Sequence, residues 1–173
     1  MSQRIKLDPR QKAAIESQHE QYLAKGMEMI HSPQTRDSIL ELLRASDPVD
    51  ALSKTLVMVL HKVDEAARSA NLEVEDAAKL MGASELLTQL YEIGEAAKIM
   101  KLMPDEIHLA LAAGIQNYVK DEVVAGRINP QKLAETMKKN LSLLSPKEKA
   151  DSLLALKKIE QTGKQYAARN AGG

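Results

Sequence analysis

The sequence predicts an all-α protein of six to seven helices in a compact bundle, whose first and last helices can protrude from it. Each of the six prolines follows a residue suited to a helix boundary. An Asp, Ser or Asn in that position accepts hydrogen bonds from the first helical turn, and proline at the next position loses none. The core lacks Phe, Trp and Cys, and no strand pattern is present. The six pairs are Asp8-Pro9, Ser32-Pro33, Asp47-Pro48, Met103-Pro104, Asn129-Pro130 and Ser145-Pro146.

The first two pairs predict a long helix over about 9–30 and a shorter helix that ends near Ala45. The long helix has a sparse apolar stripe, so we expect it to pack on a partner chain rather than on its own core. The stripe consists of Ala13, Ala14, Tyr22, Leu23, Met27 and Ile30. In the shorter helix the expected inward positions are Ile39, Leu40, Leu42 and Leu43.

The third helix, over about 48–70, is apolar around its whole circumference between positions 56 and 60. Such a helix is usually central and contacted on several sides. The fourth helix is expected over about 74–101, and Gly82 can break or kink it. The most buried residues of the third helix should be Leu56, Val59, Leu60 and Val63.

Three further helices follow Pro104, Pro130 and Pro146. Gly126 is a typical residue just beyond a helix end, and Ser145 with Glu148 has the spacing of a capping box. We divide the chain into an N-terminal helix (1–31), a helical core (32–142) and a basic C-terminal helix with a frayed tail (143–173). The expected inward positions are Ile107, Leu111, Gly114, Ile115, Tyr118, Val119, Leu133, Met137, Leu153, Leu156, Ile159 and Tyr166.

Charge is balanced over the chain, with 24 residues of each sign, but it is unevenly distributed. Residues 48–126 carry more acidic than basic side chains, whereas residues 127–173 carry more basic ones. This asymmetry is best explained by solvated helix faces, and the functional alternative is an electrostatic contact with an acidic partner or with the acidic centre of a second copy. The basic residues that we select as candidates for partner binding are Lys138, Lys139, Lys147, Lys149, Lys157, Lys158, Lys164 and Arg169.

Several classes of function are disfavoured by composition. Without cysteine the chain has no disulfide, thiolate metal site or cysteine nucleophile. The longest uncharged stretch, 107–119, is shorter than the ~20 apolar residues of a membrane-spanning helix. No signal peptide is evident, and we expect a soluble protein.

The histidines do not form a recognisable site. His108 follows Asp105 by three residues, which faintly resembles half of a helical di-metal motif, but the second half is missing. A capped or solvated histidine explains His108 better. For His61 we expect a hydrogen bond to Asp64 or Glu65 of the same helix. With no catalytic constellation and no phosphate-binding loop, we predict no enzyme activity, no cofactor and no metal.

The segment 56–140 resembles the small helical structural proteins of tailed bacteriophages. The residues that carry the resemblance are LVMVLHKVDEAARSANLEVEDAA, ELLTQLYEIGEAA and YVKDEVVAGRINPQKLAETM. The resemblance implies a non-enzymatic virion component, internal or near the portal and tail. It transfers no functional residue to this chain.

Two functions follow as hypotheses. The first is a structural or assembly protein that acts through helix-mediated protein contacts, as a homo-oligomer or in a larger assembly, in a virion or the host cytoplasm. The second is a cytoplasmic adaptor or regulator that binds a protein or nucleic acid through the basic segment. Lysines without aromatic neighbours can contact phosphates but give little base stacking, so nucleic acid is the weaker partner.

Overall fold

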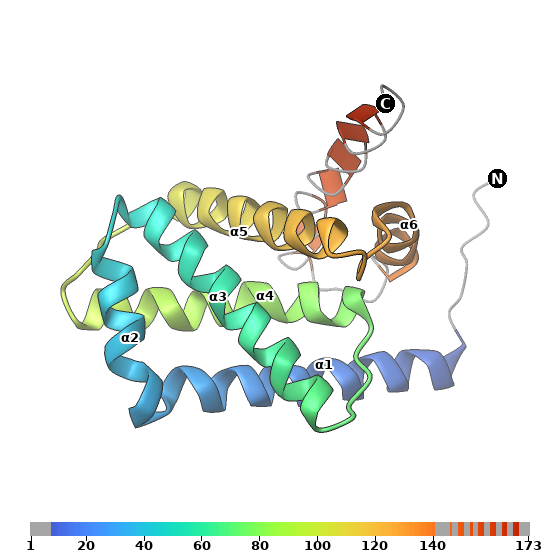
Figure 1. Cartoon of the computed structure of the whole chain (residues 1–173), viewed down its shortest axis with the longest axis horizontal. Helices are drawn as coiled ribbons and strands as arrows, with labels where there is room; N and C mark the ends of the chain where they lie inside the picture. The colour runs from blue at the N-terminus through green and yellow to red at the C-terminus, as the bar shows by residue number, and fades with distance from the viewer. Residues whose placement is uncertain are drawn as a thin grey trace.

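Six helices make up the part of the chain that the computed structural model describes (Figure 1). The described residues are 8–140, except the side chains at positions 77, 137, 139 and 140, together with scattered positions between 146 and 169. No strand occurs among them, and the predicted all-α class is confirmed. The helices are α1 (Pro9–His31), α2 (Pro33–Arg44), α3 (Pro48–Ser69), α4 (Asp76–Ala96), α5 (Pro104–Val124) and α6 (Pro130–Asn140).

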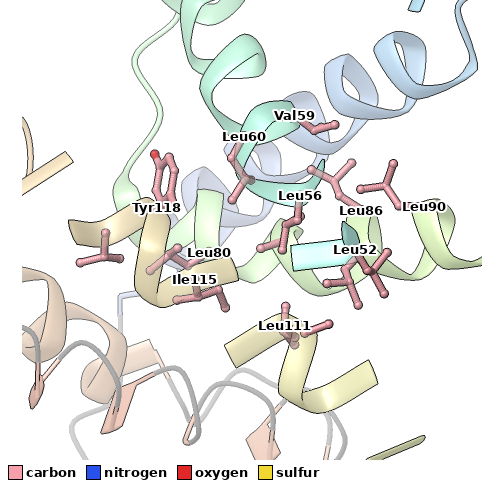
Figure 2. Close-up of a cluster of buried hydrophobic side chains, with 14 of the residues drawn as sticks. Leu52, Leu56, Val59, Leu60, Leu80, Leu86, Leu90, Leu111, Ile115 and Tyr118 are labelled. Atoms are coloured by element: carbon pink, nitrogen blue, oxygen red, sulfur yellow. The ribbon is translucent and has the colours of Figure 1, made fainter. Parts of the chain in front are cut away.

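The central element is α3, which crosses the bundle and contacts α1, α2, α4 and α5 (Figure 1). Its apolar circumference explains this position, because a helix that is apolar all round has no face for solvent. Leu56, Val59, Leu60 and Val63 are completely buried, as predicted. Figure 2 shows the side chains of α3 pointing toward those of α4 and α5 across a shared core.

Five of the six helices, all except α4, begin at a predicted proline pair. In α1, α2 and α3 the Asp or Ser before the proline accepts a hydrogen bond from the second helical residue. Before α6, the Asn129 side chain accepts two such bonds, each 3.0 Å long. Before α5, Met103 offers no capping oxygen, and Glu106 instead accepts from the Met103 N–H at 2.7 Å. In the sixth pair Pro146 is helical and exposed, whereas Ser145 and Glu148, the two residues of the expected capping box, lie outside the described residues.

Three helices end in the same motif, with one residue in the left-handed region. These residues are Asn71 after α3 (φ 51°), Lys98 after α4 (φ 57°) and Gly126 after α5 (φ 70°). The sequence predicts two of these ends, at Asn71 and Gly126, because asparagine and glycine are the residues that commonly adopt this conformation. The expected end of the fourth helix at Lys101 is therefore wrong: at Lys98 the chain turns, and the Ile99 N–H donates back to the Gly94 carbonyl at 2.9 Å.

The packing of α1 differs from what its sparse stripe suggests. From Ile15 onward α1 packs along α4 and is buried against its own chain, with Tyr22 completely inaccessible. Close approach is possible because of Gly26, where an added Cβ would lie 2.5 Å from a methyl carbon of Leu86. Gly82 neither breaks nor ends α4, and faces Tyr22 of α1. Contact between α1 and another chain stays a prediction.

Some predicted inward positions point elsewhere. Leu42 is exposed and Leu40 is only half-buried, because Ile39 and Leu43, one turn apart, already occupy the inner face of α2. In the C-terminal segment Leu156 joins the core, whereas Leu153 is exposed. The side chain of Met137 and the residues Ile159 and Tyr166 lie outside the described part of the chain. No helix within that part has the length and apolar character needed to span a bilayer.

Candidate functional site

A buried carboxylate, Asp64, joins four helices near the end of α3. It is almost inaccessible and accepts hydrogen bonds from two tyrosine hydroxyls. Tyr22 of α1 donates to Oδ1 at 3.1 Å, and Tyr118 of α5 donates to Oδ2 at 2.6 Å. Lys79 of α4 places Nζ 3.4 Å from Oδ1. Burial, with the added negative charge of Asp64, raises the pKa of both tyrosines far above the ordinary value. Asp64 is thus held by side chains from three other helices.

Lys79 also forms an ion pair with a second carboxylate, that of Asp76. Its Nζ lies 3.3 Å from Asp76, in the first turn of α4. Partial burial raises the pKa of Asp76, and the ammonium of Lys79 opposes this change without overcoming it. One positive charge is therefore divided between two carboxylates, and Asp64 has the two tyrosines in addition. Asp76 remains the less compensated of the two.

A second buried carboxylate, Glu122 on α5, is held by the turn that follows the helix. Arg127 binds it through Nε and Nη2, both at 2.8 Å. Such a two-pronged contact is the strongest common form of ion pair between side chains. The hydrogen bonds from Arg127 lower the pKa of Glu122. This pair therefore fastens the turn at 125–129 onto α5.

His61 of α3 lies between two carboxylates of α5. Its Nδ1 is 3.3 Å from Glu122 and its Nε2 is 3.3 Å from Asp121, while its ring packs against Tyr118 with centroids 5.3 Å apart. The expected hydrogen bond within its own helix is wrong, because the ring extends across to α5. The two carboxylates approach opposite ring nitrogens, so one ion could not bridge all three groups. No cluster with metal-binding geometry occurs among the described residues.

A cavity of about 500 Å³ lies beside these two carboxylate clusters. It opens between the loop before α4, the turn after α5 and the first turns of α6. Asp76 and Arg127 both line it, so each cluster contributes its outermost member to the same cavity. Val74 and Leu133 add apolar surface. The arrangement combines an acidic group, a basic group and an apolar wall, as small-molecule sites commonly do.

None of the selected basic residues that the structure describes lines this cavity. Lys138 pairs with Glu160 at 2.5 Å, which lowers the pKa of Glu160. The structure also describes four exposed basic residues of the C-terminal segment: Lys149, Lys157, Lys164 and Arg169. The side chain of Lys139, together with the residues Lys147 and Lys158, lies outside the described part. His108 is an exposed residue near the start of α5.

The sequence reasoning missed the partners within the buried clusters. A signal for them existed, because Tyr22 and Tyr118 occupy inward positions in a chain that has only four tyrosines and no other aromatic residue. A buried tyrosine hydroxyl needs a hydrogen-bond partner. Asp64, one residue beyond the inward Val63, was a candidate for that role. Nothing local pointed to Arg127 and Glu122 as a pair.

Comparison of the chain with protein-family models, curated proteins and solved structures finds no significant match.

Proposed function

We propose that the protein is a non-enzymatic structural or assembly protein that acts through helix-mediated contacts with further copies of itself. The observation that carries this proposal is the outer side of α5. Its inner side packs on α3, yet Leu109 and Val124 are 61% and 72% exposed. Helical spacing places both on the same side of α5. Met103, just before the helix, is 66% exposed. Leu109 and Val124 lie about 22 Å apart along the helix, and a partner chain laid along this side would remove both apolar side chains from water, which is favourable in proportion to the area buried.

Charge supports a second copy as the partner. The acidic excess of residues 48–126 and the basic excess of residues 127–173 are complementary between copies. Surfaces of opposite sign on one chain allow head-to-tail contacts that close into rings or extend. The resemblance to tailed-phage structural proteins suggests the specific setting, a virion component that resides in the particle or the host cytoplasm.

Light scattering on the full chain at increasing concentration tests the proposal. We expect an oligomer that dissociates when Leu109 and Val124 are both replaced by lysine. The matched control is Leu42→Lys, an exposed leucine on α2, which should leave the association unchanged. A monomer at every concentration, or equal dissociation in both variants, would contradict the proposal.

The exposed basic residues of the C-terminal segment favour a second candidate function, an adaptor or regulator that binds an acidic protein or nucleic acid in the cytoplasm. Lys149, Lys157, Lys164 and Arg169 are available for such a contact. Replacing all four by glutamine should abolish salt-sensitive binding of a fluorescent DNA duplex. The first function predicts no DNA binding in the parent chain.

A further inference from the structure

We propose that the cavity between α4, the turn after α5 and α6 binds a free α-amino acid with an apolar side chain. The groups that would recognise it are two acidic residues, two basic residues and two apolar residues. They are Glu75, Asp76, Arg127, Lys132, Val74 and Leu133.

The acidic side of the cavity calls for a positive charge. Asp76 is partly buried, and its only basic partner among the described residues is Lys79. Lys79 is shared with Asp64, which lies at 3.4 Å from the same ammonium. Burial raises the pKa of Asp76 in spite of this neighbour. An ammonium group in the cavity would supply the missing charge and would also meet the exposed carboxylate of Glu75.

The basic side suits a carboxylate. Arg127 holds Glu122 through Nε and Nη2, its side chain remains 45% exposed, and the residue lines the cavity. A guanidinium has five N–H donors, and two of them are used by Glu122. Lys132 adds a second positive charge on the same wall.

The apolar residues of the cavity favour amino acids with an apolar side chain. Val74 is half-buried and Leu133 is buried, and both line the cavity, so part of its wall is aliphatic. An aliphatic side chain on the ligand would remove apolar surface from water there, which is favourable in proportion to its area. The volume of about 500 Å³ is in the range of small-molecule sites and leaves room for leucine with bridging water. Charge and shape together indicate leucine or a similar amino acid.

Titration calorimetry with three probes tests this inference directly. Free leucine should bind, whereas N-acetyl-leucine lacks the ammonium and leucinamide lacks the carboxylate. We expect each blocked probe to bind about tenfold more weakly or worse, since a charge-assisted contact is lost. Failure of leucine to bind, or equal binding of all three probes, would overturn the inference.

Two variants assign the charged contacts within the intact chain. Asp76→Asn should weaken leucine binding without changing the affinity for N-acetyl-leucine, which has no ammonium. Lys132→Gln should weaken leucine binding without changing the affinity for leucinamide, which has no carboxylate. The matched controls are Glu73→Gln and Lys120→Gln, which are exposed positions outside the cavity. If the controls weaken leucine binding as much as the cavity variants, the ligand lies elsewhere. The association of the chain, measured by light scattering, reports separately on the proposed function.

Discussion

The contact between α3 and α5 is apolar along one half and polar along the other. In the apolar half, Gly114 of α5 lies so close to α3 that an added Cβ would be 2.9 Å from a methyl carbon of Leu56. In the polar half, Asp64 and His61 of α3 reach Tyr118, Asp121 and Glu122 of α5. The first half gains stability from close packing and depends on volume. The second half gains hydrogen bonds only when every partner is present, so it favours one register of the two helices.

The apolar half should show the largest effect of a single substitution. Leu60→Ala removes a completely buried side chain from the middle of α3 and should lower the free energy of unfolding by about 2–5 kcal/mol. Urea denaturation measures this change. Val57→Ala is the control, because Val57 on the same helix is only half-buried and should cost less. Equal losses in the two variants would show that α3 is not the central helix.

The polar half should respond to loss of a hydroxyl alone. Tyr118→Phe keeps the ring and removes the 2.6 Å bond to Asp64, with an expected cost of about 1.5–3 kcal/mol for a hydrogen bond to a charged group. Tyr22→Phe, which removes the longer bond of 3.1 Å, should cost less. The control is Tyr91→Phe, whose hydroxyl donates to the exposed Glu95 at 3.0 Å. If Tyr91→Phe costs as much as Tyr118→Phe, burial does not strengthen the cluster.

The contrast explains what could be predicted from the sequence. The inner faces of α3 and α5 follow helical periodicity, so Leu56, Leu60, Ile115 and Tyr118 were assigned correctly. The starts of α1, α2, α3 and α6 were also predictable, because a capping residue and a proline lie side by side in the chain. The polar clusters join residues far apart in sequence, such as Asp64 and Tyr118. Periodicity assigns such residues to a face and does not give their partner across the interface.

Helix ends were harder to predict than starts for a related reason. The starts of α1, α2, α3 and α6 have a chemical signature, the capping oxygen followed by proline, whereas the ends of α3, α4 and α5 require only one residue with positive φ. Gly126 is a residue type that commonly adopts positive φ, whereas Lys98 is not. His61 shows the same limit: Asp64 and Glu65 are close in sequence, yet the imidazole finds its carboxylates on α5.

Alkaline pH should weaken the polar half of the contact selectively. Burial and the charge of Asp64 raise the pKa of Tyr22 and Tyr118 in the folded chain. Their stabilising contribution is therefore complete below the ordinary tyrosine pKa of about 10 and is lost as pH rises above it, since the unfolded chain ionises first. Urea denaturation across this range should show a steeper loss of stability in the parent chain than in Tyr118→Phe. If stability falls equally with pH in the two proteins, Tyr118 has the same pKa in the folded and the unfolded chain.

The smallest expected effect concerns the turn after α4. This turn lies outside the α3–α5 contact, so a change there gives a stability effect with which the effects in both halves of the contact can be compared. Lys98 adopts φ 57°, a conformation that costs a residue with a Cβ roughly 1 kcal/mol and that glycine adopts freely. Lys98 is exposed, so its replacement disturbs no core packing. Lys98→Gly should therefore raise the free energy of unfolding by a few tenths of a kcal/mol, because the relieved strain only just exceeds the ~0.4–1 kcal/mol that glycine adds through the entropy of the unfolded chain.

Gly126→Ala is the reciprocal control: Gly126 has φ 70° and nothing within 4 Å of an added Cβ, so any loss on substitution reflects backbone strain alone. A stabilised Lys98→Gly with a destabilised Gly126→Ala would show that both turns are set by the left-handed residue. If Lys98→Gly is neutral or destabilising, the Lys98 side chain contributes to the turn through contacts that outweigh its strain.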